Sequence, residues 1–431
     1  MIEKKLRKFI FPSIFAMLGI SLYVLADTFF ISVAAGTNGI TALNMALPVY
    51  AIMYAFGSMI GIGSATRHSL GKSLGKEDYN EYFANSFVWA LLLSIFFVLI
   101  GIFAPGSVLK LMGADDVILK TGISYMRIEL LFAPAFMLNF TMTAFVRNDN
   151  DPNIAMTATL SSSIFNIIFD YIFMFPMDMG MSGAALATGI SPIISMAVCM
   201  LHFYSKKNTI YFVKKIPSVK KLILACQLGI SGFVGEISGG VTTLTFNFVL
   251  LKIVGNIGVA AYGVVANISI IGIAVFNGIS QGLQPMASEA GGAGNEAAKK
   301  RIYRHSLQIG IIVSALLVFI CWVFADGIVN VFNSEGSEEM ADYAVVGLRL
   351  YSLGFFIAVV NIVRAGYFGA VGRAKECFII SVSRGIFAIV FFAIVLSEFM
   401  GVYGVWLAFP VAEVTTFILS LAVSRSCPEA A

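Results

Sequence analysis

The amino-acid sequence predicts an all-α integral membrane protein whose twelve transmembrane helices form two six-helix lobes, each a parallel repeat of the other. Three observations lead to this fold class. The chain is 58% hydrophobic and only 12% charged, which is about half the charged share of a typical soluble domain. Its 431 residues have room for about twelve apolar crossings of roughly 20 residues joined by short loops. Features of the first half also recur in the second half, so we expect membrane helices and loops without a folded soluble domain.

The first predicted span is an uncleaved membrane helix. Basic residues from Lys4 to Lys8 precede an apolar run from about Phe9 to Ala35, which is too long for the core of a signal peptide. Gly36 to Gly39 predict a tight turn into a second span over about 40–66. The remaining spans are expected near 83–104, 121–146, 154–176, 182–204, 222–250, 258–285, 306–325, 343–368, 378–399 and 403–423.

Loop charges predict the orientation in the membrane. Nearly all loop Lys and Arg fall on the side of the N-terminus, whereas the opposite loops are acidic. Because basic loops stay in the cytoplasm, we expect a multi-pass protein of the cell membrane with both termini cytoplasmic. The basic stretch 205–221 lies at the midpoint and predicts a cytoplasmic linker between an N-terminal lobe (1–204) and a C-terminal lobe (222–431). Recognition of anionic lipids is the alternative for this stretch.

Several function classes are not expected. The five Cys form no CxxC pair and no Cys/His spacing typical of zinc, so we expect neither a resident metal nor a cofactor. The net charge of +4 is spread over short loops and does not indicate nucleic-acid binding. No GxxxxGK[ST] loop occurs, and no His lies near a buried nucleophile. An enzyme is therefore not expected, and we expect a monomer in the lipid bilayer.

An internal repeat appears at a shift of 219 to 222 residues. The segment 39–42 then aligns with 258–261, and 75–77 with 294–296. Because six helices bring the chain back to its starting side, the two halves are parallel repeats. Transporters built from such repeats hold their substrate between the halves.

Four polar residues are predicted to meet inside the membrane. At a rise of 1.5 Å per residue, Asp27 lies about 27 Å from the cytoplasmic edge, Asp170 about 24 Å and Thr188 about 21 Å, with Asn166 one turn before Asp170. Polar groups at this depth are costly, so each is a functional hypothesis. Two carboxylates, an amide oxygen and a hydroxyl can bind Na⁺ or share H⁺. Hydrogen bonding between helices is the alternative role.

The repeat places aromatic residues opposite these four positions, within a residue or so. The matched positions are Phe246, Phe387, Phe391 and Phe409. Folding of a six-helix unit therefore does not require polar groups there.

The second half has fewer candidate residues. Glu236 lies about 21 Å from the inner edge and could bind a cationic substrate, relay protons or make a packing hydrogen bond. Four amides could line a cavity or serve in packing, namely Gln281, Gln284, Asn139 and Asn361. Glu129 and Glu413 could pair with Arg127 or Arg384, or extend toward the membrane interface, and we assign them no functional role.

Several motifs resemble the multidrug and toxic compound extrusion (MATE) transporters over essentially the whole chain. The segments 11–13 and 26–30 resemble the first helix of that family, and 61–63 with 71–78 its second-helix exit. The most specific similarity is Asn166 to Asp170 followed by Gly183 to Thr188. Residues 278–285 are similar to the eighth-helix element.

The resemblance implies two six-helix lobes and export of organic cations coupled to inward Na⁺ or H⁺. It places the ion site of the first lobe at Asp27, Asn166, Asp170 and Thr188, and it likens Glu236 to a seventh-helix glutamate of some relatives. Ser231, where the family usually has proline, and the acidic stretch 147–152 depart from the pattern and leave the coupling ion open.

Two other functions remain as alternatives. A lipid-linked saccharide flippase of the same superfamily would hold pyrophosphate in a basic cavity, and the buried acids of this chain disfavour such a cargo. A membrane receptor or scaffold without transport is the second alternative.

Overall fold

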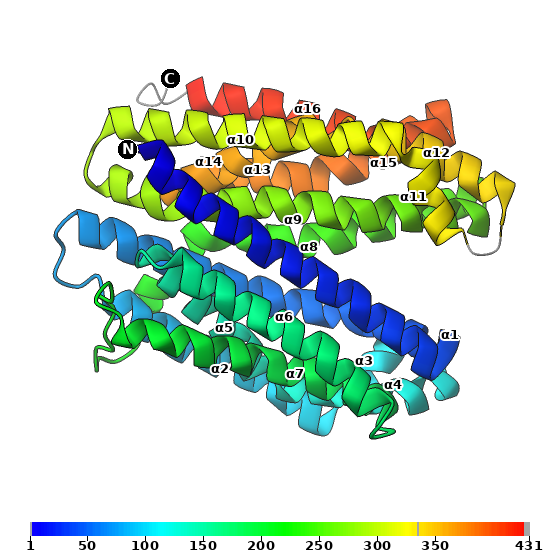
Figure 1. Cartoon of the computed structure of the whole chain (residues 1–431), viewed down its shortest axis with the longest axis horizontal. Coiled ribbons are helices and arrows are strands. Elements are labelled where there is room, and N and C mark those ends of the chain that lie inside the picture. The colour runs from blue at the N-terminus through cyan, green and yellow to red at the C-terminus, as the bar shows by residue number, and fades with distance from the viewer. Residues whose placement is uncertain (1, 334–335, 426–431) are drawn as a thin grey trace.

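The computed structural model describes residues 2–333 and 336–425, which form helices and no strand. Figure 1 shows them as a bundle of long helices. The elements are α1 (Ile2–Ser73), α2 (Glu81–Phe103), α3 (Pro105–Leu111), α4 (Asp116–Leu131), α5 (Ala133–Asn148), α6 (Pro152–Met174), α7 (Gly180–Cys199), a 3₁₀ turn η1 (Met200–Tyr204), α8 (Val219–Ile253), α9 (Asn256–Gly292), α10 (Glu296–Val323), α11 (Ala325–Phe332), α12 (Glu338–Ser352), α13 (Phe355–Ala370), α14 (Ala374–Val382), a π-helical turn η2 (Ser383–Phe387), α15 (Ala388–Met400) and α16 (Val402–Arg425).

The helices account for the predicted spans. Within the described ranges, ten helices are long and apolar enough to cross a membrane, and two bent helix pairs raise the number to as many as twelve. The element α1 contains two of these spans, because Gly36 adopts a φ of 59° and breaks the helical path. Only glycine enters this backbone region without steric cost.

Two spans that the sequence predicts as continuous are broken. The pair α4 and α5 bends by 45°, and the pair α12 and α13 bends by 46°. At the first break Pro134 occupies the first turn of α5, where its ring is tolerated, whereas it would clash with the preceding turn of a continuous helix. At the second break Gly354 precedes α13.

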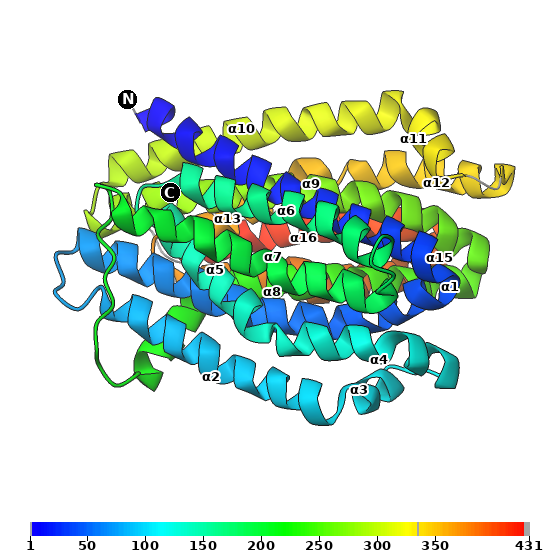
Figure 2. The same cartoon turned by 60° about the horizontal axis from the view of Figure 1, so that its bottom comes forward.

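The helices gather in two groups, one from the chain up to α7 and one from α8 onward (Figure 1). Figure 2 shows α2 and α10 at opposite edges with the two helices of α1 between them. The groups share backbone landmarks, since Gly36, Gly75, Asn150 and Gly180 have a positive φ and so do Gly255, Gly294, Gly372 and Gly401. These pairs lie 219 to 222 residues apart, as the sequence repeat predicts. The limits 1–204 and 222–431 stay a prediction.

The first helix of α1 contributes to the cores of both groups. Leu6, Ile10 and Ile14 belong to a core built mainly from α9, α13 and α16, whereas Ile31 belongs to the core of α4 and α5. This helix therefore crosses from one group to the other (Figure 1).

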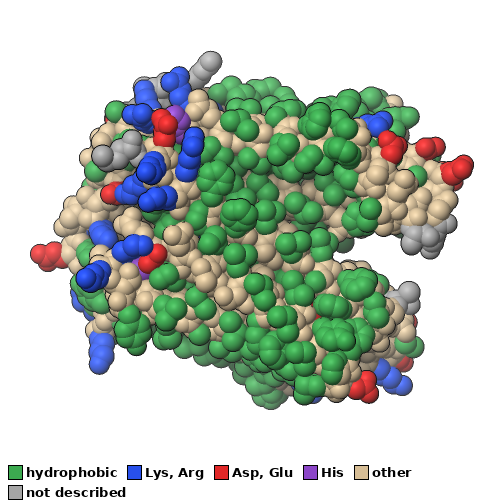
Figure 3. All heavy atoms as spheres, viewed as in Figure 1, with side chains coloured by type: hydrophobic (Ala, Val, Ile, Leu, Met, Phe, Trp, Pro, Cys, Tyr) green, Lys and Arg blue, Asp and Glu red, His purple; other side chains and the backbone are tan. Residues whose placement is uncertain are grey.

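The two groups are in close contact at one end and separate at the other. Lys and Arg gather where α1 begins and α16 ends, and we call this the basic end (Figure 3). There Gly278 and Gly282 of α9 face the backbone of Ile14 and Ile10, and an added Cβ would lie 2.6 Å from each Cα. At the opposite, acidic end the surface is hollowed between the groups (Figure 3). The molecule is thus closed at the basic end and open at the acidic end.

The segment 205–221 is held along the first group. Asp149 accepts hydrogen bonds from the Thr209 backbone at 2.6 Å and from Lys72 at 3.0 Å, and it contacts His202 at 3.0 Å. Burial works against its ionisation, but the bonds from His202, Thr209 and Lys72 outweigh it and lower the pKa of Asp149 to about 2. Lys221 closes the attachment at 2.6 Å from Asp78.

Candidate functional site

Four residues predicted from depth lie together in the first group. Asp27 on α1, Asn166 and Asp170 on α6 and Thr188 on α7 are all at most 8% exposed. The Asn166 side-chain amide donates to the Thr188 hydroxyl at 3.0 Å, Asp170 lies one turn beyond Asn166 on α6, and Asp27 and Thr188 line one pocket. The structure therefore brings these residues into one region, while their role stays a prediction.

Small residues set the helices that bear this cluster close together. Gly19, two turns before Asp27, packs against Leu160 and Ser163 of α6, where an added Cβ would lie 2.7 Å from Leu160. Gly183 approaches the backbone of Phe173, and an added Cβ there would lie 2.9 Å from it. The close approach of α1, α6 and α7 thus depends on the absence of side chains at these positions.

The cluster contains oxygen atoms without hydrogen-bond partners among the described residues. These atoms are both carboxylate oxygens of Asp170, Oδ1 of Asp27 and Oδ1 of Asn166. Buried polar atoms are rarely left unpaired, because each costs about 1–3 kcal/mol. Hard oxygen atoms of this kind suit a bound cation or a shared proton.

A pocket that the sequence did not predict adjoins Asp27. It has a volume of about 90 Å³ and is lined by Asp27, Thr188, Glu129, several apolar residues and the tyrosines Tyr23, Tyr50 and Tyr125. Pairing of Glu129 with Arg127 or Arg384 was one possibility from the sequence. Residues two apart on a helix point in different directions, and both carboxylate oxygens of Glu129 lack a partner among the described residues.

A larger cavity lies between the two groups. It has a volume of about 330 Å³, within the range of sites for drug-sized molecules, and its walls come from α1, α8, α9 and α16. Glu236 of α8 lines it, as do Gln281 of α9 and the Arg384–Glu413 pair. The sequence identified Glu236 and Gln281, but it could not show that they share one cavity.

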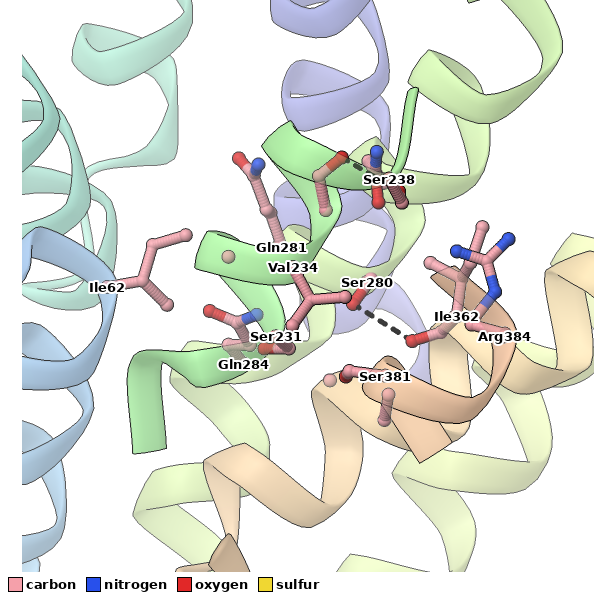
Figure 4. Close-up of a pocket in the computed structure, with 15 residues that line it drawn as sticks. Ile62, Ser231, Val234, Ser238, Ser280, Gln281, Gln284, Ile362, Ser381 and Arg384 are labelled. Atoms are coloured by element: carbon pink, nitrogen blue, oxygen red, sulfur yellow. Dashed lines mark hydrogen bonds between the residues drawn. The ribbon is translucent and has the colours of Figure 1, made fainter. Parts of the chain in front are cut away.

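A smaller pocket adjoins this cavity and is shown in Figure 4. Gln281, Gln284 and Ser280 of α9 line it together with Ser231 of α8 and Arg384. The Ser280 hydroxyl donates to the Ile362 backbone at 3.3 Å. Gln284 is therefore placed at a cavity, as one of its two predicted roles requires.

Several predicted residues make hydrogen bonds or ion pairs between helices. Arg384 of η2 pairs with Glu413 of α16 at 2.6 Å, which confirms one of the predicted pairings. The Asn361 amide donates to the Glu413 carboxylate at 2.7 Å. Gln281 accepts a hydrogen bond from Arg147 of α5 at 2.6 Å and so links the two groups. Asn139 is not among the residues that line the large cavity.

The repeat-related positions in the second group are apolar, with one adjustment. Phe246 is buried and Phe409 stacks on Tyr351 with ring centroids 4.2 Å apart. Phe387 and Phe391 are exposed, whereas Ala388 is buried. The shift of 222 residues between the landmarks Asn150 and Gly372 already places Asn166 opposite Ala388.

Comparison with known families supports one assignment. The MatE family model matches residues 12–172 and 238–394, which is more than half of the chain. Among curated proteins, "Multidrug export protein MepA" of Staphylococcus haemolyticus is 26% identical over 434 residues, covering 99% of this chain and 94% of its own. The protein of the same name from Staphylococcus saprophyticus is 25% identical, covering 95% and 90%.

Solved structures show the same fold. A MOP superfamily transporter from Pyrococcus furiosus, described as having a binding pocket of reverse polarity, superposes with a TM-score of 0.91 at 22% identity and covers 99% of this chain and 95% of its own. A MATE transporter described as outward-facing gives a TM-score of 0.89 at 23% identity, with coverage of 99% and 95%.

Proposed function

The chain belongs to the MatE family, and from this premise we propose that it is a secondary antiporter that exports organic cations and drugs across the cell membrane in exchange for inward Na⁺ or H⁺. Its relatives named MepA are multidrug export proteins. The observation that carries the proposal is the group of buried, unpartnered oxygens on Asp27, Asn166 and Asp170. Such a group is stable only if a cation or protons occupy it for part of the cycle.

The coupling site requires no other group than these side chains. Na⁺ would contact the carboxylate oxygens of Asp27 and Asp170 and the amide oxygen of Asn166. Thr188 already accepts the Asn166 amide, which leaves the Asn166 oxygen free to bind. A proton would instead reside on one of the two carboxyls, because two like charges at close range favour protonation of one.

The cavity between the groups provides the path for the cargo. Glu236 contributes an acidic side chain to its wall, whereas Arg384 is paired with Glu413. A cationic cargo is therefore favoured over an anionic one. With the basic end in the cytoplasm, the open acidic end makes this an outward-facing state.

The test is efflux of a fluorescent organic cation from proteoliposomes, with Na⁺ and H⁺ gradients imposed separately. We expect one gradient or both to drive uphill movement of the cation. If neither gradient drives flux while the purified protein binds the cation, a receptor or scaffold replaces the antiporter. Transport of a lipid-linked pyrophosphate instead would favour the flippase, although the paired state of Arg384 weighs against it.

A further inference from the structure

We propose that the segment 205–221 and the first turns of α2 form a binding site for an anionic phospholipid of the membrane leaflet at the basic end. In this site Lys214 and Lys220 bind the phosphate of the head group, and Phe212 and Ile216 contact the adjoining part of the acyl chains. The inference concerns the outer surface of the protein and depends on neither the cargo nor the coupling ion.

The first observation is the charge that remains after the segment is attached. The stretch 205–221 contains six Lys and neither Asp nor Glu. Three of the lysines are paired with acids of the first group, namely Lys207 with Asp151, Lys215 with Glu81, and Lys221 with Asp78 and Glu81. Lys206, Lys214 and Lys220 are exposed and have no ion pair among the described residues. The attachment therefore leaves three positive charges at the surface.

Two of these unpaired lysines flank the start of α2. Lys215 and Lys221 both bind the carboxylate of Glu81, which is the first residue of α2. Lys214 and Lys220 are their neighbours in sequence, and consecutive Cα atoms lie only about 3.8 Å apart. Because a lysine side chain is long and flexible, both ammonium groups can reach one common phosphate. The surface is positive on balance, since the acids beside it are already bound by other lysines.

The second observation is that the segment continues the lipid-facing surface of α2. Four apolar residues recur at a spacing of four and lie on one face of this helix, namely Phe83, Phe87, Leu91 and Ile95. Leu91 and Ile95 are exposed on an apolar membrane span and therefore face lipid. Phe212 packs against Phe83 and Phe87, with ring centroids 6.3 and 6.2 Å apart. The segment thus lies at the edge of the membrane, where a lipid-facing stripe ends.

The third observation is that apolar side chains are exposed among the lysines. Phe212 is 52% exposed and Ile216 is 93% exposed. The Ser218 backbone N–H donates to the Asn85 side-chain oxygen of α2 at 2.6 Å, so the polar backbone is turned toward the first group while Ile216 stays at the surface. Figure 2 shows this segment as an extended loop at the end of the molecule where α2 begins. A surface that combines apolar side chains with lysines suits the boundary between acyl chains and head groups.

These observations together favour a phospholipid over a free anion. A free phosphate would use the lysines but would leave Phe212 and Ile216 without a contact, whereas an acyl chain along Leu91 and Ile95 brings its head group to the lysines. Each Lys beside an anionic leaflet strengthens binding roughly fivefold. Two unpaired lysines therefore distinguish an anionic lipid clearly from a zwitterionic one.

The test measures lipid binding to the purified full-length protein by native mass spectrometry, with phosphatidylglycerol and phosphatidylcholine as probes. We expect the first phosphatidylglycerol to bind at least tenfold more tightly than the first phosphatidylcholine. The double variant Lys214→Gln/Lys220→Gln should raise the phosphatidylglycerol dissociation constant at least tenfold. The matched control Lys4→Gln/Lys8→Gln removes the same charge from exposed positions of α1 at the basic end, and it should change that constant less than twofold.

A further variant separates the contact with the acyl chains from the charge. Ile216→Ser alters a side chain that is almost wholly exposed, so the fold should persist, which the thermal unfolding temperature checks for every variant. We expect Ile216→Ser to bind phosphatidylglycerol several-fold more weakly. Inorganic phosphate at millimolar concentration should not displace the lipid, because it lacks the acyl chains.

Equal affinity of the wild type for the two lipids would overturn the site, as would equal losses in the two double variants. The unpaired lysines would then serve only to orient the chain in the membrane. Displacement of the lipid by inorganic phosphate, together with wild-type binding by Ile216→Ser, would also overturn it and would indicate an anion site instead. The proposed antiport is tested separately by efflux, so it would stand or fall independently of these results.

Discussion

Asp27 and Asp170 carry buried carboxylate oxygens that have no hydrogen-bond partner among the described residues. Replacing either with Asn preserves the shape and removes a carboxylate of the proposed coupling site. We expect Asp27→Asn and Asp170→Asn each to abolish coupled efflux in proteoliposomes with little change in unfolding temperature. The counterpart of Asp27, Phe246, is buried and apolar, and the counterpart of Asp170 after the one-residue adjustment, Phe392, is partly buried and apolar, so these positions need no carboxylate to pack. Efflux at the wild-type rate in either variant would exclude that residue from coupling.

Replacing Glu413 should lower the stability of the protein, unlike replacement of Asp27 or Asp170, because the Glu413 carboxylate is paired with Arg384. Glu413→Gln would leave the Arg384 guanidinium, whose side chain is 12% exposed, without a counterion. Loss of one partner of a buried ion pair costs on the order of 3 kcal/mol, so we expect a clear fall in unfolding temperature. Adding Arg384→Met to this variant should restore part of the stability. A single variant as stable as the wild type would mean that cavity water solvates Arg384 fully.

The depth of a residue in the membrane is predictable from its position along a helix, but the side chains that contact it from other helices are not. The fixed rise per residue was enough to bring Asp27, Asp170 and Thr188 to one level. The sequence offered the same possible partners for Glu413 and Glu129, yet among the described residues only Glu413 is paired, because partners come from helices distant in sequence. The pocket beside Glu129 became visible only with the structure.

At the scale of single elements, the hydrogen bonds that attach the segment 205–221 to the first group can be tested by mutation. Asp149 accepts from the Thr209 backbone and from Lys72, and hydrogen bonds to a charged group contribute about 1.5–3 kcal/mol each. Asp149→Asn should therefore release this segment, seen as at least tenfold faster amide hydrogen exchange over 205–218. The exposed Asp178→Asn, outside the attachment, is the control.

The same attachment should depend on pH in a defined direction. The pKa of Asp149 is lowered from 3.8 to about 2 in the folded protein, so its contribution is complete above about pH 4 and is lost as the pH falls toward 2. Exchange over 205–218 should stay slow at pH 5 and rise on acidification below 4. Equal exchange at pH 5 in the wild type and Asp149→Asn would contradict the attachment.

The breaks within helices could not be predicted from the hydrophobicity of the sequence. Twelve apolar segments follow from hydrophobicity and length alone, yet the bends at α4–α5 and α12–α13 depend on Pro134 and Gly354, which a hydrophobicity pattern does not weigh. The π-helical turn η2 was not foreseen for the same reason, since it changes helix geometry without changing hydrophobicity. The order of the elements was thus predictable, and their local geometry was not.

At the scale of the whole molecule, the closed basic end is a contact between backbones. Two of the ion pairs that cross it, Lys5–Glu289 and Glu3–Arg301, are largely exposed, and such pairs contribute little, about 0–1 kcal/mol. The close contacts of Gly278 and Gly282 with α1 have no room for adjustment, because the opposing atoms are backbone. The balance between outward-facing and inward-facing states should therefore depend on these glycines more than on the charges.

Gly278→Ala tests this directly. Its Cβ would lie 2.6 Å from the Cα of Ile14, and overpacking of this kind costs about 1–3 kcal/mol in the closed arrangement alone. A free-energy difference of that size changes the ratio of the outward-facing to the inward-facing state by roughly 5- to 150-fold, so the basic end should open.

Gly263→Ala on the same helix is the matched control, because its Cβ would meet no atom within 4 Å. Spin labels at the exposed positions Lys76 and Ala297 would report longer distances in Gly278→Ala and unchanged distances in Gly263→Ala. The same distribution in both variants would show that the two groups are held together by contacts elsewhere.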